Sequence, residues 1–355
     1  GETMDSGEYT YVKGGRFSKN NVKKRIKSNP IEDIDEYGAP EEFEPEERRK
    51  ETPLVIFAVI LSFSAASMLA TKLIYDMIFV RYDAPAEVPA ALSQLVADRE
   101  VVEYEVDGVP VAGYLYRSTG ENAQDALVVV APGFHAGADD YLGQIQSLLD
   151  YGWSVFAYDP TGSCNSGGES YVGFPQQILD MEATLEYIQE KHRFGYEKLA
   201  LLGHSRGGYA AACALESDYD IDAVITVSGV NSAMEGIMGH ASAYVGPVAY
   251  GNYGFLWLYQ VMLFGTDIVN ATADEAISGS DVPVMIVHGA KDDQFPMDKN
   301  SIISHSGEMR REGVEYVICE AAGQDGHTDL LFSPEGTANA ELMAQIHEFL
   351  ERSIA

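Results

Sequence analysis

Short apolar segments alternate with longer amphipathic segments from residue 100 to the C-terminal end. Residues 101–117 alternate apolar and polar side chains about Asp107-Gly108, which is a strong hairpin signal. Six further runs have the composition of buried strands: 126–132, 153–160, 198–203, 223–229, 282–289 and 314–321. Helical patterns lie between or after them, at 139–152, 175–192 and 338–354. This order predicts an α/β fold with a mostly parallel, eight-stranded sheet covered by helices on both faces.

One of these strands leads directly into a helix through the sequence "GHSRGG" at 203–208. At such an elbow the central residue takes a strained backbone conformation that lifts its side chain clear of the sheet. The chain is crowded on either side, so the positions two before and two after must be small. Gly203 and Gly207 meet this requirement around Ser205. We therefore predict that Ser205 is a nucleophile at the carboxyl edge of the sheet.

A serine nucleophile needs a base, and the base needs an acid that orients it. His327 lies in a loop just after the last predicted strand, so it is expected at the same edge of the sheet as Ser205. Asp292 and Asp293 follow the preceding strand, and either carboxylate is a candidate for the acid. The preferred order is Ser205 as nucleophile, Asp292 as acid and His327 as base.

Two backbone N–H groups are expected to form an oxyanion hole beside the serine. Arg206 is the first residue of the predicted helix, where N–H groups are free and the helix dipole favours negative charge. The second group is expected from the loop after the strand at 126–132, where Gly133 permits a sharp turn and Phe134 follows it.

These motifs resemble the α/β-hydrolase superfamily over about residues 100–355, and the serine aminopeptidase-like and prolyl-oligopeptidase-like hydrolases are the most similar within it. The resemblance rests on "GHSRGG", "HGAKDDQFP", the Gly-His pair at 326–327 and "APGF". In that order, these would supply the nucleophile, the acid, the base and the oxyanion loop. The segment "YDPTGSCNSGGES" (158–170) is similar to the superfamily's D-x-x-G-x-G-x-S loop, with Cys164 in place of its second glycine. The resemblance implies an α/β-hydrolase fold, with 231–280 as a cap inserted between two strands.

Residues 52–71 precede this body and carry no charged side chain. As a helix rising about 1.5 Å per residue they would span about 30 Å, the thickness of a bilayer's hydrocarbon core. A buried helix of the globular part and a cleaved signal peptide are the alternatives, and the long charged stretch before the run argues against the latter. We expect one transmembrane helix and its juxtamembrane segment at 53–80.

The charge distribution predicts how the chain is oriented. Residues 1–52 have the composition of a disordered tail and contain the basic run "RRK" at 48–50. The positive-inside rule then places the N-terminus in the cytoplasm and the hydrolase domain, 95–355, outside the cell membrane. The net charge of −32 excludes nucleic acid as a partner. The three cysteines, Cys164, Cys213 and Cys319, lack metal-ligand spacing, and no cofactor or metal is expected.

Together these features predict a membrane-anchored serine hydrolase, either an esterase or a peptidase, that cleaves an ester or amide bond through an acyl-enzyme on Ser205. Aromatic residues in the insertion suggest a small-molecule or peptide substrate with an apolar acyl group, although the same residues suit a small core of the cap itself. The competing hypothesis is a catalytically silent surface protein with this fold that binds a ligand or partner.

Overall fold

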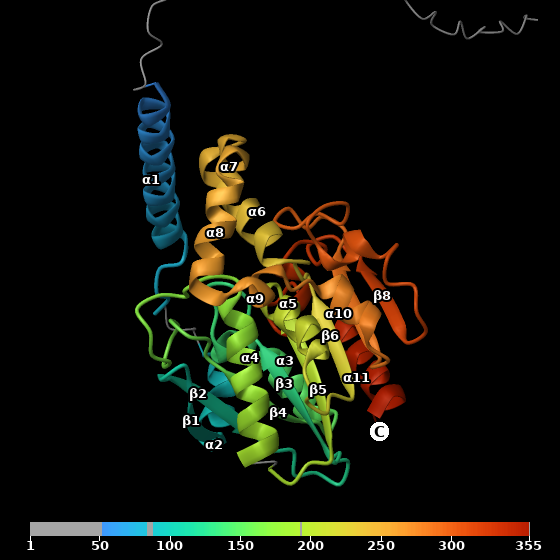
Figure 1. Ribbon diagram of the computed structural model, residues 1–355. Coiled ribbons are helices and arrows are strands. Elements are labelled where there is room, and N and C mark those ends of the chain that lie inside the picture. Colours follow the sequence, from blue (N-terminus) through green and yellow to red (C-terminus); the bar gives the residue numbers. More distant parts are fainter. Residues whose placement is uncertain (1–51, 84–87, 192–193, 355) are drawn as a thin grey trace, which may run out of the picture. The chain divides into compact units, whose positions relative to one another are not determined.

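A computed structural model describes residues 52–83, 88–191 and 194–354, and the expected tail at 1–52 lies outside these residues apart from Thr52. Its sheet confirms the predicted architecture: eight strands in the order β1-β2-β4-β3-β5-β6-β7-β8 (Figure 1). β1 and β2 pair antiparallel, as do β2 and β4, and all other neighbours are parallel. The strands are β1 (Glu100–Val106), β2 (Val109–Tyr116), β3 (Ala126–Ala131), β4 (Ser154–Tyr158), β5 (Lys198–His204), β6 (Ala223–Val227), β7 (Val284–Gly289) and β8 (Val314–Cys319).

Helices cover both faces of the sheet, as predicted. They are α3 (Leu142–Asp150), α4 (Gln176–Glu186), α5 (Arg206–Cys213), α10 (Ala273–Gly279) and α11 (Ala340–Ile354), with the short α2 (Ser93–Asp98) ahead of β1. Successive side chains of a strand point to opposite faces. Leu127 and Val129 of β3 therefore pack with α4, α5 and α10, whereas Val128 and Val130 pack with α3 and α11.

The predicted insertion lies between β6 and β7 and is helical. It contains α6 (Ala233–Val245), α7 (Val248–Gly251), α8 (Tyr253–Phe264) and α9 (Thr266–Asn270). The chain then returns to the sheet through α10, whose Ala273 and Ile277 are buried. We call residues 233–270 the cap.

The helix α1 (Thr52–Ile78) precedes the body, and its segment Pro53–Ile78 is long and apolar enough to cross a membrane. Most of its apolar side chains are exposed, but Tyr75, Ile78 and Phe79 at its C-terminal end are buried in the larger core. The next residues join the body through β-bridges from Val80 to Ser170 and from Tyr82 to Ser163. The larger hydrophobic core thus includes side chains that precede residue 95.

The guanidinium group of Arg81 strengthens this junction. Its Nη1 donates to the carbonyl oxygens of Ser166 and Gly168, and its Nη2 donates to that of Cys164, at 2.8–2.9 Å. All three acceptors belong to the loop that follows β4, so one side chain holds the end of α1 against that loop.

Candidate active site

Ser205 occupies a strained elbow between β5 and α5. Its φ of 54° and ψ of −117° are unfavourable for a residue with a side chain. A Cβ on Gly203 would lie 2.1 Å from the carbonyl oxygen of Gly207, and one on Gly207 would lie 2.2 Å from that of Ala131. Only glycine fits at either position, which is the physical reason for the spacing seen in the sequence.

Three side chains predicted as a site meet at this elbow in a continuous hydrogen-bonded chain. Nε2 of His327 lies 2.9 Å from Oγ of Ser205, and Nδ1 of His327 lies 2.7 Å from Oδ2 of Asp292. All three residues are buried. They follow β5, β7 and β8, which belong to the parallel run β5-β6-β7-β8, and the carboxyl ends of these strands form one edge of the sheet.

Of the two candidate carboxylates, the structure brings Asp292 to the imidazole and leaves Asp293 exposed. Oδ1 of Asp292 accepts the backbone N–H groups of Gln294 and Phe295, both at 2.9 Å. Burial favours the neutral acid, but the hydrogen bond and charge of His327 outweigh it and hold the pKa of Asp292 below its ordinary value. Asp292 is therefore an ionised, fixed acceptor for Nδ1–H.

A second histidine packs behind this carboxylate. His288 is fully buried on β7, with its Nε2 2.8 Å from the carbonyl oxygen of Phe295 and 3.3 Å from Oδ2 of Asp292. Burial lowers the pKa of His288 and favours its neutral form. Neutral imidazole at this site donates from Nε2 to both oxygens and supports the position of Asp292.

A buried relay of hydrogen bonds, which no sequence motif indicates, connects the loop after β3 with the loop that carries His327. The N–H of Gly133 donates to the hydroxyl of Tyr141 at 2.9 Å, and that hydroxyl lies 2.8 Å from Nδ1 of His204. Nε2 of His204 lies 3.1 Å from the carbonyl oxygen of His327. Burial lowers the pKa of His204 to about 3, so the ring is neutral and accepts at Nδ1 while donating at Nε2.

The predicted oxyanion loop lies against the serine. A Cβ on Gly133 would be 3.3 Å from Cβ of Ser205, so this loop passes close to the nucleophile and a side chain at Gly133 would crowd it. Phe134 follows at the turn, with its ring stacked on His135 and near Phe174. Arg206 is the first residue of α5, where backbone N–H groups lack an intrahelical acceptor.

The side chain of Arg206 is fully buried beside the site. Its guanidinium lies 4.5 Å from the ring centre of Tyr171, and Nη1 donates to the carbonyl oxygen of Gly173 at 3.3 Å. Its Nε and Nη2 have no hydrogen-bond partner among the described residues. The aromatic face of Tyr171 is thus its main support.

The cap contributes one residue that faces the triad. The ring of His240, on α6, lies 5.3 Å from that of Phe134 and 6.0 Å from that of Phe295, which in turn is 5.4 Å from the ring of His327. Burial and the nearby His327 lower the pKa of His240 to about 4. The aromatic side chains around the triad are therefore mainly Phe134, Phe174 and Phe295, whereas Tyr250 and Tyr253 of the cap are exposed.

The loop after β4 has a structural role. Oγ of Ser166 donates to the carbonyl oxygen of Asp159 and accepts the N–H of Ala112. Gly162 has a φ of 74°, and a Cβ there would lie 2.0 Å from the carbonyl oxygen of Ser170. This loop is rigid, and it is the loop to which Arg81 is bonded.

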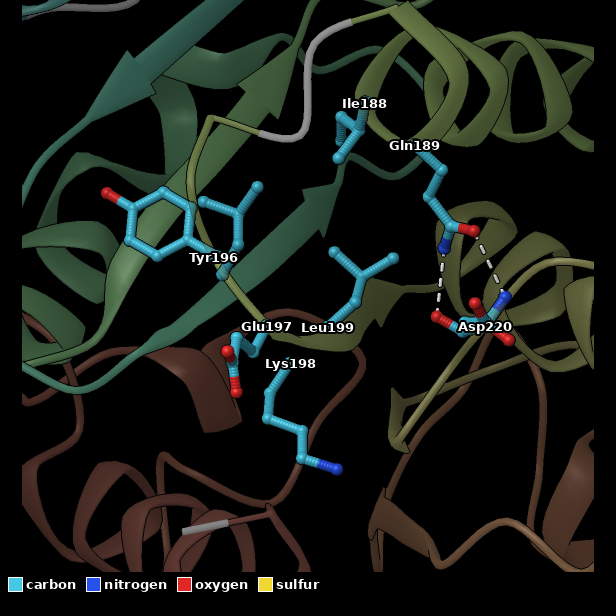
Figure 2. Close-up of a pocket in the computed structure, with 8 residues that line it drawn as sticks. Ile188, Gln189, Tyr196, Glu197, Lys198, Leu199 and Asp220 are labelled. Atoms are coloured by element: carbon cyan, nitrogen blue, oxygen red, sulfur yellow. Dashed lines mark hydrogen bonds between the residues drawn. The ribbon is translucent and has the colours of Figure 1, made fainter.

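Two other places on the molecule are separate from the triad. The pocket in Figure 2 lies at the amino ends of β3 and β5, opposite the edge that carries Ser205. Gln189, which lines it, donates from Nε2 to the carbonyl oxygen of Asp220 and accepts the backbone N–H of Asp220 at Oε1. Asp274, His305 and Glu308 form a group that offers metal-ligand atoms. Ion pairs of His305 with Asp274 at 3.3 Å and with Glu308 at 3.5 Å account for that grouping.

Comparison with known proteins agrees with this geometry. The family model for serine aminopeptidase, S33, matches residues 122–249. A proline iminopeptidase of Saccharolobus solfataricus is 34% identical over 130 residues, which are 35% of this chain and 39% of that enzyme. The match thus spans about two fifths of the relative's length.

Solved structures with the same fold include an esterase and a peptidase. An esterase of Pyrococcus furiosus has a TM-score of 0.57 at 19% identity, covering 78% of this chain and 100% of that one. An acylaminoacyl peptidase of Pyrococcus horikoshii has a TM-score of 0.52 at 16% identity, covering 72% of this chain and 41% of that one. With its sheet order, its elbow and these likenesses, the chain has the α/β-hydrolase fold, and its residues 122–249 match the serine aminopeptidase family model.

Proposed function

We propose that this protein is a membrane-anchored serine hydrolase that cleaves an ester or amide bond through an acyl-enzyme intermediate on Ser205. The observation that carries the proposal is the buried chain of hydrogen bonds from Ser205 through His327 to Asp292. A strained serine at a helix N-terminus, joined to an imidazole that is itself held by a carboxylate, has the parts needed for acyl transfer.

The reaction begins with attack by Oγ of Ser205 on the substrate's carbonyl carbon. Nε2 of His327 takes the hydroxyl proton as the new C–O bond forms, and Asp292 stabilises the imidazolium through Nδ1–H. The tetrahedral intermediate collapses when His327 gives this proton to the leaving oxygen or nitrogen. Water then attacks the acyl-enzyme by the same route and regenerates Ser205.

The developing oxyanion is held by the backbone N–H groups of Phe134 and Arg206. The close approach of the Gly133 loop to Ser205 and the position of Arg206 at the start of α5 support this assignment. Donors that are already in place need no rearrangement during the reaction, and each such group contributes about 10²–10³ in kcat.

The anchor is α1, whose Pro53–Ile78 segment has the length and composition of a membrane span. The basic residues at 48–50 favour an N-terminus in the cytoplasm, with the hydrolase domain on the outer side of the cell membrane. A buried helix of the body is a poorer account, because the apolar side chains from Leu54 to Leu69 are largely exposed.

We infer that the substrate carries an apolar acyl group. The walls nearest the triad are Phe134, Phe174 and Phe295, and the imidazole of His240 is held in its neutral form. Short and long p-nitrophenyl esters compared with aminoacyl amides will separate esterase from peptidase activity, because the same triad serves both.

The nucleophile is tested with a fluorophosphonate probe on the detergent-solubilised full chain. Wild type is expected to label, and Ser205→Ala is expected not to label. The matched control is Ser278→Ala, which removes an exposed serine hydroxyl far along the chain from the elbow. Equal labelling of wild type and Ser205→Ala would overturn the assignment of the nucleophile, and no labelling of wild type would favour a catalytically silent protein.

A further inference from the structure

The cap contains an uninterrupted segment without formal charge. Residues 236–266 hold no Asp, Glu, Lys or Arg, in a chain with 55 acidic and 23 basic residues. The segment covers most of α6 and all of α7 and α8. A cap exposed only to water has no physical reason to exclude charge over such a length, because charged side chains are the ordinary covering of an exposed surface.

Many apolar side chains of this segment point outward. Val248 is 78% exposed and Met262 is 69% exposed. Five others are 41–51% exposed: Val245, Tyr250, Tyr253, Leu258 and Leu263. We call these seven residues the apolar cap surface. A contiguous helical segment that exposes so much apolar area marks an interaction site.

Other side chains of the cap pack against α1. The rings of Phe63 and Phe255 are 6.3 Å apart, those of Tyr75 and Tyr259 are 5.0 Å apart, and the side-chain amide of Asn252 donates to the hydroxyl of Thr71. Figure 1 shows α7 and α8 projecting from the sheet on the same side as α1. The cap therefore extends alongside the helix that we assign to the bilayer.

The backbone of the cap's tip is suited to a medium without water. The N–H groups of Gly246, Ala249, Tyr250 and Asn252 all donate to carbonyl oxygens three or four residues earlier in the chain. Paired backbone groups are the main requirement for entering hydrocarbon. The helix α8, of 12 residues, is about 18 Å long, which is too short to cross a bilayer but long enough to enter one leaflet.

We propose that the apolar cap surface lies in the outer leaflet of the same bilayer as α1, and that the enzyme takes its substrate, an acyl ester, from that leaflet. The inference rests on the proposed function for its anchor and its chemistry. Its partner is a lipid bilayer, because the surface exposes apolar side chains, lies in a segment without charge, and belongs to a cap that contacts the proposed spanning helix.

The cap also connects this surface to the catalytic serine's surroundings. α6 begins in the body, carries His240 to within 5.3 Å of the Phe134 ring, and ends at Val245 on the apolar cap surface. One helix thus runs from the walls of the site to the lipid-facing surface. An acyl chain held in the leaflet lies at the outer end of the same helix.

The depth of the cap is tested with the full chain in phosphatidylcholine vesicles. Single cysteines at Val248 and Met262 are labelled with a polarity-sensitive thiol dye, and labelled wild type corrects for the three native cysteines. The matched control is Val101→Cys, because Val101 is 65% exposed on β1 in the body. Lipids with a quencher on the acyl chain are expected to quench the two cap labels several-fold more strongly than the control label. Equal quenching at all three positions would refute membrane contact, and so would dye fluorescence that reports a nonpolar environment at the cap without any quenching by the lipids.

The route of the substrate is tested with two esters, one carried in vesicles and one short and soluble. Met262→Lys is expected to lower the rate on the vesicle ester about tenfold relative to the soluble ester, because a charge at a lipid-facing position is costly. Val101→Lys is expected to leave this ratio unchanged. An unchanged ratio in Met262→Lys would refute entry from the leaflet. Loss of both activities in wild type would instead refute the proposed hydrolase, while the quenching data would still decide the cap's position.

Discussion

The relay through Tyr141 allows a sharp test of how the oxyanion loop is held. The change is Tyr141→Phe, which removes one buried oxygen and leaves the ring in place. That oxygen accepts the N–H of Gly133 and lies 2.8 Å from Nδ1 of His204. Its loss leaves one buried donor without its partner on the loop after β3, and one buried acceptor without its partner at the end of β5.

The size of the effect follows from these two contacts. Each buried polar group that loses its partner costs about 1–3 kcal/mol, so the variant should lose about 2–6 kcal/mol of unfolding free energy. The lower half of this range is expected, because the loop at Gly133 already runs close to His204: a Cβ on Gly133 would lie 3.0 Å from Nδ1 of that ring. A small shift of the loop can therefore bring it to the ring and offset part of the loss. At about 2–4 °C per kcal/mol, a loss of about 2–4 kcal/mol should lower the melting temperature by about 4–16 °C.

The same small shift moves the N–H of Phe134, the residue after Gly133. Because an oxyanion donor is worth about 10²–10³ in kcat, a partly displaced donor should lower kcat by about 10–100-fold. KM should change little, since the walls of the site are untouched. The assay is hydrolysis of a soluble ester by the full chain in detergent, with thermal unfolding of the same preparation followed by circular dichroism.

The matched control is Tyr104→Phe. The hydroxyl of Tyr104 is also buried and lies 2.6 Å from Oγ1 of Thr184, but it is between β1 and α4, away from the site. This variant should lose stability and keep its kcat. If Tyr141→Phe kept a wild-type kcat, or if both variants lost kcat to the same extent, the positioning role of Tyr141 would be refuted.

Three further predictions concern the acid, the pH response and the elbow. Asp292→Asn should lower kcat by about 10³–10⁴ by stabilising the wrong tautomer of the base, while Asp293→Asn should retain it, as measured by ester hydrolysis. The unfolding free energy should fall as the pH drops from 6.5 towards 3, because His204 binds a proton in the unfolded state but not when it is buried. At pH 5 this residue alone should lower the unfolding free energy by about 2 kcal/mol. His204→Gln should therefore show a weaker dependence of stability on pH in denaturant titrations. Gly207→Ala should cost about 3 kcal/mol or more or prevent folding, whereas Gly254→Ala, whose added Cβ meets no atom within 4 Å, should be neutral or slightly stabilising in thermal melts.

The sheet and the elbow could be predicted because their signals are local. Buried strands have a recognisable composition, and the crowding at the elbow requires glycine at fixed distances from Ser205. The positions of Asp292 and His327 could also be predicted, since residues that follow parallel strands gather at one edge of the sheet. The choice between Asp292 and Asp293 needed coordinates, because neighbours in a turn point in different directions and only geometry selects one.

Other features left no local pattern in the sequence. The relay from Gly133 through Tyr141 to His204 joins residues on separate loops, and a single tyrosine among 21 is not distinctive. The packing of Tyr75 and Phe79 into the body was also hidden, because the apolar side chains that suit a membrane suit a protein core equally well. Long-range contacts of this kind depend on how whole helices and strands are placed relative to one another. The hydrophobic periodicity of the sequence contains no information on that placement.

The junction made by Phe79, the bridges at Val80 and Tyr82, and the three hydrogen bonds of Arg81 has a consequence for the proposed membrane-anchored hydrolase. A domain on a loose tether sweeps a wide volume above its membrane. Under the proposal, this domain would instead travel with its stem, so its serine would keep one height and one orientation as the protein diffuses laterally. Encounter would then depend on the number of target molecules per unit area, and hydrolysis of molecules dissolved in the surrounding fluid would gain little.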